Sequence, residues 1–210
     1  MTVHELERDV RAQLGDAATV LLLAPSFSEQ EGDRCVDLLD PERTADGNAL
    51  WISYTKSPDK QVRRFRSRSE STPRNVGVIS VDDAARSAAA ASGSGGSPDG
   101  GLETRADTIT SPNDLTGLGI RITEYLRGWE DDDGDTVVCF DSLTALLQYV
   151  ELETAYEFLH VLTGRFAAVG AFAHFHMDPT AHDDQTVETI TSLFDAVVEL
   201  DEDGHTVRMR

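Results

Sequence analysis

The sequence predicts a single α/β domain, built around a mostly parallel β-sheet that helices cover on both faces. Its 210 residues are enough for one domain with a sizeable core, and 40% of them are hydrophobic. Unbroken apolar runs recur along the chain, which is typical of strands that are buried on both faces. Amphipathic stretches separate these runs, and strands that alternate with helices indicate a parallel sheet. Ligands of such sheets bind at the carboxyl ends of the strands, so a site is expected there.

The first part of the chain follows this alternation. Apolar runs predict buried strands at 19–24, 49–55 and 76–81. A short helix is expected between the first two strands, at 34–39. The stretch SPDKQVRRFRSR opens with a Ser-Pro-Asp helix start and predicts a second helix over 57–68.

A segment of small residues follows the third strand. AARSAAAASGSGGSPDGG holds almost no large apolar side chain, so it can bury little surface to offset its ordering entropy. It predicts a flexible Gly/Ser-rich loop at about 84–106. Because strands are predicted on both sides of this loop, it is not a domain linker, and one domain is expected to span 1–210.

The rest of the chain resumes the pattern. A capped, periodic stretch predicts a helix at 111–129, and DTVVCFD predicts a strand at 135–141. A helix at 152–166, a strand at 167–176 and a helix at 184–194 are expected next. Two short runs at 196–200 and 205–210, with Asp-Gly between them, predict a C-terminal β-hairpin.

The charge balance indicates the compartment. The chain has 38 acidic and 18 basic residues, a formal net charge of −20, and only Lys56 and Lys60 are lysines. An acidic, lysine-poor surface is typical of a halophile's cytoplasm, where molar salt screens self-repulsion. The same surface argues against nucleic-acid binding, which needs a basic face.

Targeting features point to the cytoplasm as well. No apolar run approaches the roughly 20 residues that span a bilayer, and the N-terminus has no signal-peptide pattern, so no membrane association is expected. Cys35 and Cys139 lie far apart in the sequence, and Cys139 stands inside an apolar run. They are therefore expected to be reduced thiols of a cytoplasmic protein rather than a disulfide framework.

Three stretches of the sequence resemble the RecA/KaiC-like superfamily of P-loop ATPases, in particular its uncharacterised haloarchaeal relatives. They are ISYTKSPDKQVRRF, SPNDLTGLGIRITEYL and VVCFDSLTALL. The resemblance covers nearly the whole chain and implies a three-layer RecA-like sandwich. It also implies that Asp141 and Ser142 are the remnant of the strand that holds Mg²⁺, and it leaves a homo-oligomer open.

Two parts of that machinery depart from the family pattern. A phosphate-binding loop needs glycines, a lysine and a hydroxyl residue, but APSFSEQEGDRC has Gln30 and Glu31 near the lysine and threonine positions. What remains of a phosphate-binding loop is Ser26, Ser28 and Gly32. Alternatively, this stretch is a plain connection between a strand and a helix. Where the family has a glutamate that activates water, this chain has Thr55 and Lys56, and neither is a general base at neutral pH. Asp141 could ligate a metal through water, but without a phosphate loop we favour a role in capping the helix that follows it.

A second group of candidate residues is HFHMDPTAHDDQ, which resembles part of the binuclear metal motif H-x-H-x-D-H. His174 and His176 alternate with Phe175 on a predicted strand, so both point to one face, and Asp178 follows the strand. The three are candidate metal ligands. The alternative is a polar strand end with hydrogen-bonded histidines. Either way the group is expected beside Asp141.

Together these observations predict a non-catalytic pseudo-ATPase, with no catalytic residues and no cofactor, that acts as a binding or regulatory signalling module. The alternative is a divergent nucleotide-binding protein or metal-dependent hydrolase, which would use Asp141, His174, His176 and Asp178 with weakly bound nucleotide or a divalent metal. A basic run on the second helix offers a docking patch for a protein partner, or else a solvated face: Arg63, Arg64, Arg66 and Arg68.

Overall fold

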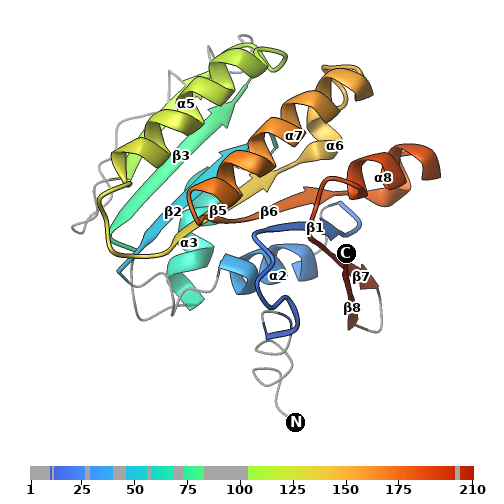
Figure 1. Cartoon of the computed structure of the whole chain (residues 1–210), viewed down its shortest axis with the longest axis horizontal. Helices are drawn as coiled ribbons and strands as arrows, with labels where there is room; N and C mark the ends of the chain where they lie inside the picture. The colour runs from blue at the N-terminus through green and yellow to red at the C-terminus, as the bar shows by residue number, and fades with distance from the viewer. Residues whose placement is uncertain are drawn as a thin grey trace.

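An eight-stranded sheet forms the centre of the molecule, with strand order β4-β3-β2-β5-β6-β1-β7-β8 (Figure 1). The computed structural model describes residues 10, 12–26, 29–39, 46–55, 58–68, 73–82, 104–201 and 204–210. All neighbouring strands are parallel except β7 and β8, which form an antiparallel hairpin. The predicted α/β class, mostly parallel sheet and C-terminal hairpin are therefore confirmed. The strands are β1 (Thr19–Leu23), β2 (Asn48–Ser53), β3 (Asn75–Val81), β4 (Thr104–Ile109), β5 (Thr136–Asp141), β6 (Phe172–Met177), β7 (Ala196–Asp201) and β8 (Gly204–Met209).

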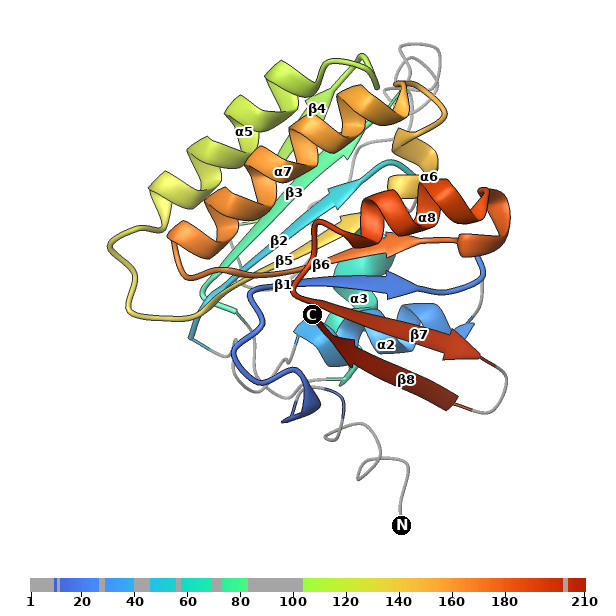
Figure 2. The same cartoon turned by 45° about the vertical axis from the view of Figure 1, so that its right-hand side comes forward.

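Helices cover both faces of the sheet, so the molecule has three layers (Figures 1 and 2). One face carries α5 (Leu115–Gly128), α6 (Leu143–Leu146), α7 (Leu152–Ala168) and α8 (Asp184–Thr191). The other face carries α2 (Glu29–Leu39) and α3 (Pro58–Arg68). In the part of the chain that the structure describes, no helix has both the length and the apolar character needed to cross a membrane.

Alternate residues of each central strand enter different cores. On β6, Ala173 and Phe175 pack in the core beneath α5 and α7, while Phe172 packs in the core beneath α2 and α3. His174 and His176 have the same strand parity as Phe172, so they lie on the α2 side. Both histidines are almost completely buried, at 0% and 2% exposure. This confirms the prediction that the two rings share one face.

The largest differences from the prediction concern β4, the start of α2 and the start of β6. β4 was missed because its sequence, TRADTI, is polar and mostly exposed, and it takes residues 104–106 that we assigned to the end of the loop. The rest of that loop, 84–103, lies outside the described residues. Helix α2 begins at Glu29 rather than at 34. Residues 167–171 do not open β6: α7 continues to Ala168, and Gly170, with a φ of 69°, lies in the turn that follows.

Phe175 occupies the middle of an aromatic cluster in the larger core. Its ring lies 4.9 Å from that of Phe194 and 5.3 Å from that of Phe140, and its side chain is fully buried. We expect Phe175→Ala to lower the free energy of unfolding by about 3–5 kcal/mol, because it removes a large apolar group and leaves a cavity. Denaturant unfolding in molar salt measures the change. The exposed Val161→Ala is the control and should alter stability by less than about 0.5 kcal/mol; equal effects of the two substitutions would contradict the assigned packing.

Candidate functional site

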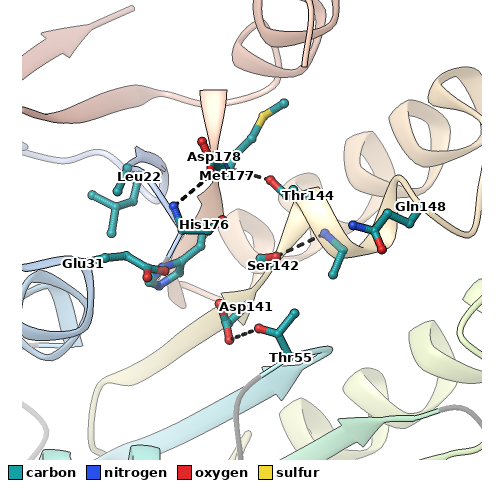
Figure 3. A pocket seen from close by; sticks show the side chains of 13 residues that line it. Leu22, Glu31, Thr55, Asp141, Ser142, Thr144, Gln148, His176, Met177 and Asp178 are labelled. Carbon is teal, nitrogen blue, oxygen red and sulfur yellow. Dashed lines mark hydrogen bonds and ion pairs between the residues drawn. The ribbon is translucent and has the colours of Figure 1, made fainter. Parts of the chain in front are cut away.

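A cavity of about 120 Å³ opens at the carboxyl ends of β1, β5 and β6 (Figure 3). This is the edge of the sheet at which the sequence predicted a site. Its walls carry three carboxylates, those of Glu31, Asp141 and Asp178. The cavity is therefore acidic, and its volume makes it small for a ligand site.

Asp141 ends β5 with only 1% of its surface exposed. Thr55, which follows β2, donates a hydrogen bond from Oγ1 to Asp141 Oδ2 at 3.0 Å (Figure 3). Our expectation that Asp141 caps the next helix is wrong. Ser142 is the N-cap of α6, because its Oγ accepts the N–H of Ala145 at 3.2 Å. Asp141 is thus left facing the cavity, whereas the Ser142 hydroxyl is used in the cap.

Glu31 and His176 form a buried pair that lines the same cavity close to Asp141. Glu31 Oε1 lies 2.7 Å from His176 Nδ1, and the two side chains are 5% and 2% exposed. Figure 3 shows Glu31 reaching from α2 to the ring of His176, which comes from β6. The sequence analysis identified Glu31 only as one of the two residues that stand near the lysine and threonine positions of a phosphate-binding loop. The pairing depends on how α2 packs on the sheet, so no local pattern could have predicted it.

Asp178 has a different role from the one predicted. Its carboxylate accepts the Ser26 N–H at 2.8 Å, and the Thr180 N–H at 3.0 Å, and so ties the loop after β1 to the end of β6. Its own N–H donates to Thr144 Oγ1 at 2.8 Å. Burial raises the pKa of Asp178, but the hydrogen bonds from Ser26 and Thr180 outweigh it, so the pKa is lowered. Asp178 is an acceptor of structural hydrogen bonds, and among the described residues it is in no group of ligand atoms close enough to share a metal ion with the two histidines.

The other phosphate-loop candidates are not brought to the cavity as a set. Ser26 is held there by Asp178, whereas Ser28 lies outside the described residues. Gly32 is buried against α3: a Cβ at this position would lie 2.1 Å from an Arg64 guanidinium nitrogen. Gly32 therefore lies where α2 meets α3, and it is not among the residues that line the cavity.

Asp178→Asn should destabilise the protein modestly and should change its response to acid. We expect a loss of about 1 kcal/mol at neutral pH, because the two N–H groups bond different carboxylate oxygens and the amide has only one oxygen that can accept. Since the folded pKa is lowered, the carboxylate contributes its stability above the unfolded pKa of about 4 and loses it as the pH falls through the folded value. The difference between the two proteins should therefore shrink below about pH 4. Urea unfolding from pH 7 to pH 3 measures it, with the exposed Asp131→Asn as the control; a pH-independent difference would contradict the assignment.

Four residues with sulfur or nitrogen ligand atoms meet beneath the cavity. Cys35, Cys139, His174 and His176 are all buried, and one ligand atom of each lies within 4.8 Å of all the others. The two sulfurs are 3.3 Å apart, and neither cysteine forms a disulfide. The pKa of Cys35 is lowered well below its ordinary value, chiefly by the hydrogen bond with Cys139 and, against the opposing effect of burial, by the charges of His174 and His176. Sequence reasoning predicted the two histidines but not the cysteines beside them.

A second set of ligand atoms faces the cavity itself. Glu31, Asp141 and His176 each have a ligand atom within 4.8 Å of the other two. His176 belongs to both sets, and its two ring nitrogens face different groups: Nδ1 faces Glu31, and Nε2 lies 3.5 Å from Cys139 Sγ. One imidazole thus joins the cavity to the cluster beneath it.

Comparisons with known proteins bear on the family and the fold. A family model described as a family of unknown function, DUF7504, matches residues 17–200. No curated protein sequence matches the chain. A structural-project protein from Pyrococcus horikoshii OT3 is similar in structure, with a TM-score of 0.56, 11% identity, and coverage of 96% of this chain and 91% of that one. The flagellar accessory protein FlaH from Methanocaldococcus jannaschii gives a TM-score of 0.53 at 12% identity, covering 96% of this chain and 83% of that one. At such identities the likeness concerns the fold alone, and the predicted RecA-like fold is confirmed.

Proposed function

The chain belongs to the DUF7504 family, whose function is unknown, and we propose that it is a non-catalytic RecA-like domain. In this proposal it is a pseudo-ATPase that serves as a binding or regulatory module. Its acidic, lysine-poor composition favours the cytoplasm of a haloarchaeon as its setting. The proposal rests on the chemistry of the cavity at the carboxyl ends of the strands.

The observation that carries the proposal is the buried carboxylate of Glu31. It stands in the first turn of α2, where a phosphate-binding helix would present N–H groups and a hydroxyl to an anion. Asp141 and Asp178 line the same cavity, so a triphosphate would meet three carboxylates and no lysine among the described lining residues. The N-terminus of α2, which would otherwise favour an anionic ligand, already has the carboxylate of Glu31 beside it.

Two further features agree with this interpretation. The volume of about 120 Å³ is below the roughly 300 Å³ at which small-molecule sites begin, which agrees with a cavity that does not enclose a nucleotide. Thr55, at the position of the expected base, donates its hydroxyl hydrogen to Asp141. A threonine in this arrangement cannot take a proton from water.

Nucleotide binding tests the proposal most directly. We expect titration calorimetry of the protein with Mg·ATP and Mg·ADP in molar KCl to show no binding at up to millimolar nucleotide. We also expect phosphate release from Mg·ATP no faster than that of the Asp141→Ala variant. Saturable ATP binding together with turnover that is lost in Asp141→Ala would overturn the pseudo-ATPase proposal.

A second candidate function has one specific observation in its favour. Glu31, Asp141 and His176 present two carboxylates and an imidazole to an open cavity, a donor set suited to a divalent cation. A bound cation could activate water for hydrolysis, and we take a phosphate ester as the substrate to test. The alternative predicted from the sequence was also a metal-dependent hydrolase, although it used His174 and Asp178 where this set has Glu31. Metal-stimulated hydrolysis of a chromogenic phosphodiester, lost in Asp141→Ala, would support this candidate over the first.

The partner of a non-catalytic domain would be a protein, either another chain or a second copy of this one. The structure describes two side chains of the basic run on α3, those of Arg63 and Arg64. Arg64 forms an ion pair with Asp33 at 2.9 Å, while Arg63 is exposed. The side chains of Arg66 and Arg68 lie outside the described residues.

A further inference from the structure

We propose that the α2 face of the sheet holds a structural zinc ion, bound by Cys35, Cys139, His174 and His176. This site lies in the core beneath the cavity, and it does not depend on whether the cavity binds nucleotide. It differs from the metal site predicted from sequence, because Asp178 is replaced by two thiolates.

The donor set is that of a closed structural zinc site, with two sulfurs and two imidazole nitrogens. Zinc–sulfur bonds of about 2.3 Å and zinc–nitrogen bonds of about 2.0 Å place two sulfurs about 3.8 Å apart in a tetrahedron, and a sulfur and a nitrogen about 3.5 Å apart. The sulfurs of Cys35 and Cys139 are 3.3 Å apart. His174 Nε2 is 3.3 Å from Cys35 Sγ, and His176 Nε2 is 3.5 Å from Cys139 Sγ. The four groups are thus already gathered to nearly the spacing that the ion requires.

The surroundings favour a metal over a disulfide or an open network of polar groups. A sulfur–sulfur bond measures about 2.0 Å, well below the observed separation. The four side chains are between 0% and 6% exposed, and Cys35 and Cys139 are members of the apolar core beneath α2 and α3. Zn²⁺ with two thiolates and two neutral imidazoles has no net charge, so it can be buried there at little cost in solvation.

Glu31 provides the outer contact that a zinc-bound histidine usually makes. A ligand imidazole commonly donates its other N–H to a carboxylate, which fixes the tautomer and turns the free nitrogen toward the metal. His176 has this arrangement, with Nδ1 2.7 Å from Glu31 Oε1 and Nε2 on the side of Cys139. A proton on Nδ1 keeps that nitrogen from ligating a second ion, so this site competes with the cavity metal of the second candidate function.

The site would fasten α2 to the middle of the sheet. Cys35 is the ligand from α2, whereas Cys139 comes from β5 and both histidines come from β6. Cys139 and His174 are partners in the register of β5 and β6. Cys35 is 104 residues from Cys139 and 139 residues from His174, so one ion would join segments that are distant in the sequence.

Metal analysis of the unmodified protein is the primary test. The protein should be purified without a histidine tag or chelators, in molar KCl, and analysed by plasma mass spectrometry. We expect about one zinc ion per chain. Exchange for Co²⁺ should give the visible absorption of a tetrahedral cobalt ion together with the near-ultraviolet sulfur-to-cobalt charge transfer that thiolate ligands produce. A folded protein that contains no transition metal and takes up neither ion would overturn the proposal, and so would a native mass showing a Cys35–Cys139 disulfide.

Three variants locate the site. His174→Gln should lose the zinc and the cobalt spectrum, while His160→Gln, at an exposed histidine of α7, should keep both. Glu31→Gln should lower zinc affinity by about 10–100-fold in competition with a chromogenic chelator, because it weakens the contact that orients His176. Unchanged zinc affinity in both His174→Gln and Glu31→Gln would overturn the assignment. If His174→Gln does not fold, the cobalt spectrum of the unmodified protein and the affinity of Glu31→Gln decide.

Discussion

The melting temperature should rise by about 10 °C or more when KCl is increased from about 0.1 M to about 2 M. The reason is the formal charge of −20, whose self-repulsion acts over a Debye length of about 10 Å in the lower salt but only about 2–3 Å in the higher. At 2–4 °C per kcal/mol, a shift of this size corresponds to about 3–5 kcal/mol. Thermal unfolding followed by circular dichroism measures it.

A charge-reduced variant is the matched control for the salt effect. Asp131, Asp133, Glu153 and Glu157 are exposed, and their replacement by the corresponding amides should raise the midpoint in low salt and reduce its dependence on salt. A midpoint that does not change between the two salt concentrations in the unmodified protein would contradict the role of screening. It would also weaken the argument for a haloarchaeal cytoplasm.

Restoring the phosphate loop alone should not give an ATPase. Gln30→Lys and Glu31→Thr, with Glu29→Gly, supply the lysine and hydroxyl that the loop lacks and remove the buried carboxylate. We expect weak Mg·ATP binding in this triple variant, because Asp141 is still available to the metal. Hydrolysis should appear only after Thr55→Glu is added, since activation of the attacking water contributes about 10²–10⁴-fold to the rate.

Phosphate release at high salt measures the outcome of this series, and Asp141→Ala in the quadruple variant controls for contaminating activity. Hydrolysis by the triple variant at the same rate as by the quadruple variant would show that Thr55 is not at the position of the missing base. The triple variant also removes the partner of His176. Its zinc content should therefore be measured alongside its activity, so that a loss of fold is not mistaken for a loss of catalysis.

The central strands could be predicted from the sequence because their apolar runs report burial directly. β4 could not, since an edge strand with exposed side chains has no apolar run to reveal it. The shared face of His174 and His176 followed from the two-residue period of a strand. The position of Cys35 and Cys139 beside these histidines could not be predicted. It depends on how α2 packs on the sheet and on the register of β5 with β6, and both involve residues that are distant in the sequence.

Glu31 shows the same limit on the side of the cavity. A glutamate in the first turn of a helix is ordinarily a solvated residue that interacts favourably with the helix dipole. Only the tertiary structure shows that it is buried and paired with a histidine 145 positions away. Asp141 and Ser142 were predicted as the remnant of the Mg²⁺-site strand, with Asp141 as the cap of the next helix. That Ser142 is the cap instead depended on the backbone geometry at the end of β5.

The polar character of β4 bears on how copies of this protein can associate. An open sheet can grow by pairing its outermost strand with a strand of another molecule, and charged side chains on that strand discourage such growth. On β4, Arg105 and Asp107 form an ion pair. At the opposite edge of the sheet, Arg208 of β8 pairs with Glu199 of the neighbouring strand β7. Both rims of the sheet are therefore poor templates for intermolecular strand addition. A homo-oligomer of this chain should assemble through its helical layers instead, leaving the sheet the same width in the assembly as in the isolated chain.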